Sequence, residues 1–158
     1  MSHLSGPLVV TKGIRNGTPE ASDSIYKDVV KSVRKRFTAA QVNASGGTPV
    51  VEGIPGHKLR LVNATLVAVG GNSAGATHVE LASKQGESAV KLVRVAVAGL
   101  ADNAVTNMFA ASNVTLLNAG ASLASNNAGE PINITRVTNN LTGATHVDVI
   151  LEYVVEED

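Results

Sequence analysis

Two histidines each stand two residues before a carboxylate, in a hexapeptide pattern that occurs twice. The copies are Gly-Ala-Thr-His-Val-Glu, ending at Glu80, and Gly-Ala-Thr-His-Val-Asp, ending at Asp148. On a strand, residues two apart point to one face, so His78 would lie beside Glu80 and His146 beside Asp148. If the copies met across a symmetry axis, the two pairs would supply four zinc ligands. We expect the simpler arrangement, a polar outer face with cross-strand hydrogen bonds, because nothing in the sequence brings the pairs together.

A second pattern, Gly-x-Ser-x-Gly, occupies residues 71–75 and centres on Ser73. In hydrolases this pattern is a nucleophile elbow between a strand and a helix of a parallel sheet. Here residues 77–81 follow with the composition of a strand, so we expect a hairpin turn. His3 and His57 have no partner at an informative spacing, and no Gly-rich loop is followed by Lys-Ser/Thr. The sequence therefore predicts no catalytic residue, no metal ion and no cofactor.

The composition narrows the classes of partner. The 158 residues suit one domain with a core built mainly of Val, Ala and Leu, and there are two Phe, two Tyr and no Trp. Few aromatic rings and a formal net charge of zero argue against direct binding of nucleic acid. Cysteine is absent, which excludes disulfides and Cys-based zinc sites. No secretory signal and no membrane-spanning run is recognisable, so we expect no membrane partner.

Short strands are the elements that must position these residues. Seven segments are rich in β-branched residues or alternate apolar with polar ones: residues 34–39, 58–69, 77–83, 89–98, 113–117, 132–137 and 146–155. Ile150 is the one apolar residue on the polar face of the last segment. Each copy of the repeat has a strand, a loop with Gly or Asn and a second strand, which predicts two similar β-hairpins. The fold class is all-β, a jelly-roll-like sandwich or barrel with approximate internal symmetry.

Long Ala- and Asn-rich loops interrupt this pattern at residues 99–111 and 119–129. They are too long for hairpin turns, so we expect crossovers between sheets or contact surfaces.

The first part of the chain lacks a core of its own. We assign residues 1–32 to an extended N-terminal arm and 33–158 to the β domain, because turn formers dominate up to about residue 28. Residues 23–33 could start a short helix, with strand or loop as open alternatives. Our hypothesis is that Leu8, Val9 and Val10 add to a partner as an edge strand.

The charges are unevenly placed along the chain. Five basic residues crowd positions 27–36, and the chain ends Glu-Glu-Asp at 156–158. The favoured interpretation is a solvated face and a frayed terminus. The alternative is that the basic stretch docks on an acidic neighbour, which makes Lys31, Arg34 and Arg36 candidate partner contacts.

Five stretches of the strand segments carry a resemblance to a known family. They are Arg-Phe-Thr-Ala-Ala-Gln-Val-Asn at 36–43, Ile-Pro-Gly-His-Lys-Leu-Arg-Leu-Val at 54–62, Thr-Leu-Val-Ala-Val-Gly-Gly at 65–71, Gly-Ala-Thr-His-Val at 75–79 and Thr-His-Val-Asp-Val-Ile-Leu-Glu-Tyr at 145–153. Through them the chain resembles the decoration, or cement, proteins of tailed-bacteriophage heads. The similarity covers about residues 33–155 and leaves the arm unaccounted for. The resemblance implies a jelly-roll-like domain bound to the outside of an icosahedral capsid at capsomer junctions. It also implies self-association as a dimer or trimer, and it carries over no catalytic residues.

The expected function is that of a virion structural protein, not an enzyme. Its partner would be the major capsid protein, and it would be made in the cytoplasm of the bacterial host. A head fibre base or a tail component is the nearest alternative. A carbohydrate-binding β-sandwich is the alternative of another class, although sugars usually stack on Trp or Tyr. A small hydrolase has only the Ser73 pattern in its favour.

Overall fold

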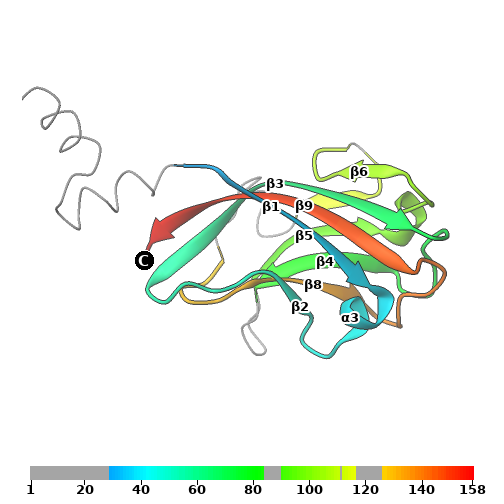
Figure 1. Ribbon diagram of the computed structural model, residues 1–158, viewed down its shortest axis with the longest axis horizontal. Coiled ribbons are helices and arrows are strands. Elements are labelled where there is room, and N and C mark those ends of the chain that lie inside the picture. Colours follow the sequence, from blue (N-terminus) through cyan, green and yellow to red (C-terminus); the bar gives the residue numbers. More distant parts are fainter. Residues whose placement is uncertain (1–28, 84–89, 111, 117–125) are drawn as a thin grey trace, which may run out of the picture.

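The protein is an antiparallel β-sandwich (Figure 1). Its computed structural model describes residues 29–83, 90–110, 112–116 and 126–158. The strands are β1 (Lys31–Thr38), β2 (Thr48–Val51), β3 (His57–Val69), β4 (His78–Ser83), β5 (Lys91–Ala96), β6 (Val105–Asn107), β7 (Val114–Leu116), β8 (Ile132–Val137) and β9 (His146–Glu157). Two short helices follow β1 and β5: α3 (Ala39–Asn43) and the 3-10 helix η3 (Val97–Gly99). The predicted arm contacts at Leu8, Val9 and Val10 lie outside the described residues.

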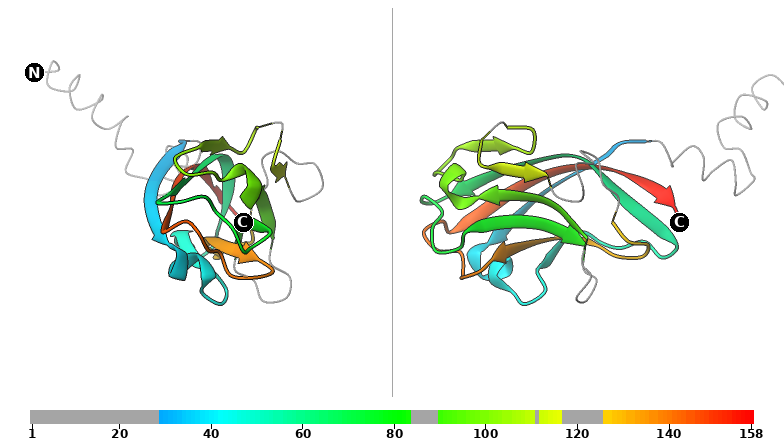
Figure 2. Two further views of the ribbon diagram at one scale, coloured as in Figure 1. Left: turned by 90° about the vertical axis from the view of Figure 1, so that its right-hand side faces the viewer. Right: turned by 180° about the vertical axis from the view of Figure 1, so that it is seen from behind.

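The strand order is that of a jelly roll. Sheet A has the order β1-β9-β3-β6, sheet B has the order β2-β8-β4-β5-β7, and every ladder is antiparallel. The first strand pairs with the last, and the second pairs with the last but one, so the chain wraps between the two sheets. Viewed end-on, the two sheets face one another around a common interior (Figure 2). The all-β jelly-roll prediction is confirmed.

The core lies between the sheets and follows the alternation of the sequence. Leu59, Leu61 and Leu66 of β3 and Val149 and Leu151 of β9 are fully buried or nearly so. Ile150, between two of these residues, is exposed on the outer face, as the sequence predicted. A register shift between Leu61 and Asn63 keeps apolar residues inward on both parts of the 13-residue strand β3.

The two predicted hairpins are wrong. Strand β3 lies in sheet A and β4 in sheet B, while β8 lies in sheet B and β9 in sheet A. The strands on either side of each repeat loop therefore pair with other strands, and each loop carries the chain across the edge of the sandwich. Loop 99–111, by contrast, holds the predicted crossover between sheets, since it leads from β5 in sheet B to β6 in sheet A.

An approximate two-fold axis relates the two halves of the sandwich. His78 on β4 lies opposite Val137 on β8, and His146 on β9 lies opposite Val69 on β3. His146 follows His78, and Val137 follows Val69, by the same offset that separates the two hexapeptides, so the same pairing recurs with the halves exchanged. The relation continues along both ladders to the pairs Ser83–Ile132 and Ala64–Leu151. The axis therefore exchanges β3 with β8, β4 with β9, and sheet A with sheet B.

The repeat loops meet at this axis. Ala74 and its equivalent Thr142 bind each other, with both N–H to carbonyl oxygen distances at 2.9 Å. The Thr77 N–H donates to Val137 O at 3.1 Å, and the equivalent Thr145 N–H donates to Val69 O at 3.0 Å. The predicted internal symmetry is thus present, although the units that it relates are corner connections and not hairpins.

The first two strands of each half also correspond, with a constant offset that is shorter than the offset between the hexapeptides. Arg36 on β1 lies opposite Asp148, and Arg94 on β5 lies opposite Glu80. Thr48 of β2 lies opposite Ile134, and Thr106 of β6 lies opposite the equivalent Leu66. Strands β1 to β4 therefore match β5, β6, β8 and β9, and β7 has no counterpart among the described strands of the first half.

Candidate partner-binding surface

The predicted basic contacts lie on β1, which forms an edge of sheet A. Arg34 and Arg36 point away from the core, since both are exposed and alternate with the core residue Phe37. Lys31 and Lys35 share the side of Val33 and Phe37 instead. The single cluster in the sequence is thus divided between the outer face and the rim of the sandwich. Residues Lys31 and Ser32, which the sequence placed in the arm, are already part of β1.

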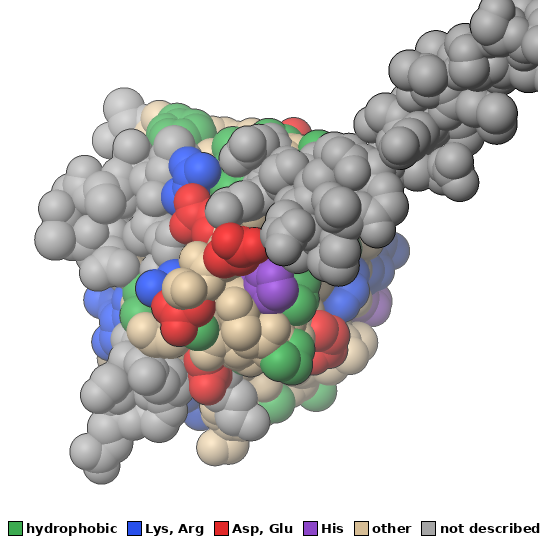
Figure 3. Space-filling view, turned by 90° about the vertical axis from the view of Figure 1, so that its left-hand side faces the viewer, with side chains coloured by type: hydrophobic (Ala, Val, Ile, Leu, Met, Phe, Trp, Pro, Cys, Tyr) green, Lys and Arg blue, Asp and Glu red, His purple; other side chains and the backbone are tan. Residues whose placement is uncertain are grey.

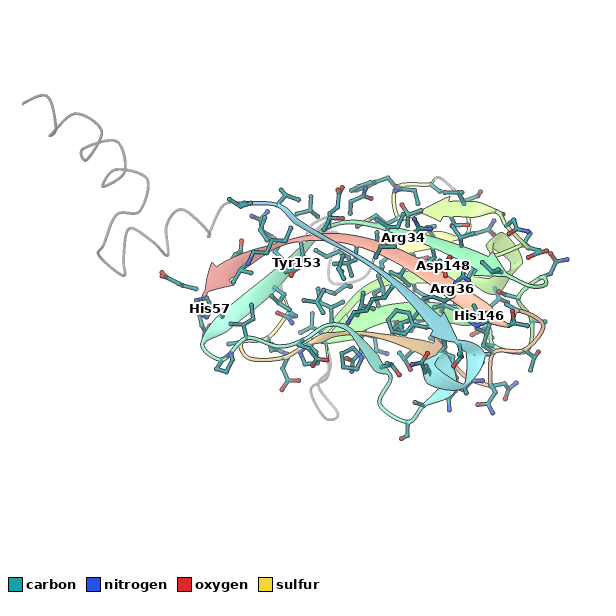
Figure 4. All side chains as sticks on the ribbon, in the orientation of Figure 1. Arg34, Arg36, His57, His146, Asp148 and Tyr153 are labelled. Atoms are coloured by element: carbon teal, nitrogen blue, oxygen red, sulfur yellow. The ribbon has the colours of Figure 1, made fainter. Side chains whose placement is uncertain are left out.

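The arginine at position 36 is held by a carboxylate from the other end of the chain. Its Nε donates to Asp148 Oδ1 at 2.6 Å, and its Nη2 donates to Asp148 Oδ2 at 2.8 Å. This is the bidentate geometry that makes arginine–carboxylate pairs specific. Figure 4 shows Arg34, Arg36, Asp148 and His146 along the stretch where β1 runs beside β9. Sequence reasoning missed this pair because it assigned Asp148 to His146.

The hydrogen bonds from Arg36 lower the pKa of Asp148 below its usual 3.8, against the opposing effect of burial. A lowered pKa in the folded state means that the pair stabilises the fold above pH 3.8 and ceases to do so as the pH falls through the lowered value. We expect Asp148→Asn to lower the melting temperature at neutral pH, and the difference from the wild type to shrink in strong acid. Thermal melts across that range measure this, with Glu52→Gln as a control, since Glu52 is exposed and lies outside the pair. A difference that persists undiminished in strong acid would contradict the role of the ion pair.

The two His–carboxylate pairs do not converge into a metal site. Glu80 is bound by Arg94, whose Nε lies 2.8 Å from Glu80 Oε2, and Asp148 is bound by Arg36. The Nδ1 atoms of His78 and His146 each lie 3.0 Å from the hydroxyl of the preceding threonine. Within the described residues, no three His, Asp or Glu side chains group together in a way that could hold a metal ion. The expected polar network of cross-strand bonds is what the structure contains.

Ser73 lies in the loop between β3 and β4 and is buried. Its hydroxyl has no hydrogen-bond partner within the part of the chain that the structure describes. The element that follows is strand β4, so the strand–turn–helix context of a nucleophile elbow is not what surrounds it. The predicted hairpin turn is wrong at this position, because the loop leads from β3 in sheet A to β4 in sheet B.

The acidic C-terminus is not frayed, contrary to our interpretation of the sequence. Strand β9 continues to Glu157, and the Asp158 N–H donates to Gly56 O at 3.2 Å. Lys58 Nζ lies 2.7 Å from Asp158, and Arg60 Nε lies 2.5 Å from Glu156. The hydrogen bond to Asp158 raises the pKa of Lys58. Figure 3 shows this end of the molecule, where acidic side chains lie among basic ones.

The outer face of sheet A is a mixed surface. Arg36, Asp148, Val67 and Val105 lie side by side across its four strands, and Val105 is exposed. Single exposed apolar residues among charged ones are ordinary on protein surfaces, so this face has no large hydrophobic patch that would by itself indicate a partner. No helix among the described residues is long and apolar enough to cross a membrane.

Neither a protein-family model, nor a curated protein, nor a solved structure matches this chain.

Proposed function

We propose that this protein is a structural component of a phage virion, which binds the outside of the capsid and stabilises contacts between capsomers. The observation that carries the proposal is the position of β1. This basic strand lies at the edge of sheet A and continues directly from residues 1–28. Arg34 and Arg36 are the exposed basic contacts that we propose on this edge, and Leu8, Val9 and Val10 are the contacts that we propose in the arm.

The proposal needs binding alone and no covalent chemistry. A protein repeated over a shell stabilises it through many identical contacts, each of which is modest. The major capsid protein is the proposed partner, and self-association as a dimer or trimer would multiply the contacts further. The jelly roll also occurs in lectins and cupins, so the fold supports this function without selecting it.

Fractionation of virions tests the proposal. We expect the chain in the capsid band of a density gradient, at a copy number near that of the major shell protein or a simple fraction of it. Mass spectrometry of each band measures this. Capsids from which this chain has been removed serve as the control. A chain found only in the soluble fraction would overturn the proposal. Adding back a variant that lacks residues 1–28 to stripped particles tests the arm, because a full return of binding would exclude its contribution.

Two alternatives give different results in simple assays. A head fibre base or tail component would be present at a few copies per particle. A carbohydrate-binding module would give hits on a glycan array. Among the described aromatic side chains, Phe37 is buried, Tyr153 packs against the core and Phe109 is exposed. Phe109 is thus the aromatic ring in this set that could stack on a sugar, and Phe109→Ala would abolish such a hit.

A further inference from the structure

The approximate two-fold symmetry is broken at one edge. Strand β5 is flanked on one side by β4 and on the other by β7, which pairs with Val93, Arg94 and Val95. Its counterpart β1 is flanked by β9 alone among the described strands. Residues of the second half follow their first-half equivalents by a larger number of positions after β6 than before it. The additional residues of the second half include β7. The position of β1 that corresponds to the site of β7 lies along Lys35, Arg36 and Phe37, and no strand among the described residues pairs with it.

The backbone of β1 is arranged to receive a strand there. The Ala39 N–H donates across to Thr145 O of the β9 side, whereas the Thr38 N–H turns away and donates to Gln41 Oε1. Backbone groups of successive strand residues point to opposite sides, so Ser32, Arg34 and Arg36 direct their N–H and C=O groups to the open edge. These groups have no partner among the described residues.

The charge at this edge determines which kind of added strand would pair favourably with β1. Arg34, Lys35, Arg36 and Asp148 line a shallow depression of about 320 Å³. Asp148 balances Arg36, while Arg34 has no ion pair within the described part of the chain and Lys35 Nζ lies 3.4 Å from Pro49 O. Positive charge therefore remains in excess.

Basic residues on an edge strand discourage pairing with neutral or like-charged strands. A second copy of β1 would place cations opposite cations, which is unfavourable. An acidic strand would instead gain both backbone hydrogen bonds and charge complementarity.

We propose that the open edge of β1 accepts an extended acidic segment of another protein, which adds to sheet A as β7 adds to sheet B. This inference rests on the proposed function in that it requires a protein partner, but it does not require a capsid. The segment supplies backbone groups to Ser32, Arg34 and Arg36 and carboxylates to the depression beside Arg34.

A model peptide tests strand addition on the full chain. The probe is an acetylated peptide of about seven residues that alternates glutamate and valine, and its matched control replaces glutamate by lysine. We expect the acidic probe to slow amide exchange at Ser32, Arg34 and Arg36 by about tenfold, measured by NMR, and the basic peptide to have no effect. Equal effects of both peptides, or protection elsewhere in the sheet, would overturn the proposal. So would protection of these amides in the chain alone at high concentration, because a second copy would then occupy the edge.

Three variants distinguish the contribution of backbone hydrogen bonds to peptide affinity from that of charge. Ser32→Pro removes one outward N–H and leaves the β9 ladder and the charge intact, so we expect affinity to fall about fivefold. Arg34→Glu reverses the charge with the backbone unchanged, and we expect a loss of about tenfold or more. Lys91→Glu makes the same change on β5, whose edge β7 fills, and is expected to bind like the wild type. Full binding by Arg34→Glu would contradict the proposal even if Ser32→Pro did not fold.

The failure of this inference is distinguishable from failure of the proposed function. If capsids bind the protein but leave the β1 amides unprotected, strand addition is excluded and the virion role stands. If the protein binds the acidic peptide but is found only in the soluble fraction, the virion role is excluded and strand addition stands.

Discussion

Replacing Gly143 by alanine is expected to lower the free energy of unfolding by more than about 3 kcal/mol. Gly143 has a φ of +82°, and a Cβ added there would lie 2.1 Å from the backbone oxygen of Asn72. That oxygen belongs to the other repeat loop, so it moves only if the contact at the two-fold axis opens. The symmetry repeats the constraint, since a Cβ on Gly75 would lie 2.4 Å from Asn140 O. We therefore expect Gly75→Ala to be about as damaging.

Gly56→Ala is the matched control for this experiment. Gly56 has a similar φ of +73°, but a Cβ added there would meet nothing within 4 Å. Its replacement adds backbone strain alone, of about 1 kcal/mol. Urea denaturation of the three variants, followed by circular dichroism, measures the difference. If Gly143→Ala cost no more than Gly56→Ala, the two loops would not pack against each other as described.

The sequence predicted most strands because their side chains alternate between a core and a surface. The bounds of β8, residues 132–137, were predicted correctly, and β9 extends two residues beyond its predicted end. Strands β2 and β6 were missed. The first contains Pro49, which is tolerated because β2 is an edge strand, and the second has three residues in an Ala- and Asn-rich stretch. Neither has the length or alternation that identifies a strand locally.

The hairpin error has a different cause. A strand, a Gly-containing loop and another strand have the same local sequence whether the second strand pairs with the first or crosses to the facing sheet. The choice is made by distant partners: β3 pairs with β9, and β4 pairs with β8. What the repeat did predict is that the two connections are equivalent. Equivalence is a property of the sequence itself, whereas pairing is a property of the whole fold.

The candidate surface was predictable in part. Lys31, Arg34 and Arg36 are visible as a basic run, and the sequence placed Arg34 and Arg36 on a strand, but it assigned Lys31 to the arm. The bond between Arg36 and Asp148 joins residues 112 positions apart, so no local pattern reports it. The open edge of β1 is less visible still in the sequence. It depends on β7 pairing with the counterpart strand β5, while no described strand pairs with the same edge of β1.

The two symmetry-related ion pairs are expected to differ strongly in their effect on stability. Arg94→Met should lower the free energy of unfolding by about 3 kcal/mol, because it leaves the Glu80 carboxylate, with a side chain only 6% exposed, without its cation. Arg36→Met removes the equivalent cation, but that side chain is 56% exposed and its partner Asp148 is 14% exposed. Water replaces much of the lost interaction there, so we expect a clearly smaller effect.

Urea denaturation of both variants at neutral pH measures this difference. The double variant Glu80→Gln with Arg94→Met serves as the control, since it removes the uncompensated charge and should recover much of the loss. Equal losses for Arg94→Met and Arg36→Met would mean that burial does not separate the two pairs. A double variant no more stable than Arg94→Met would mean that the side chain of Arg94 stabilises sheet B by its packing and not by its charge.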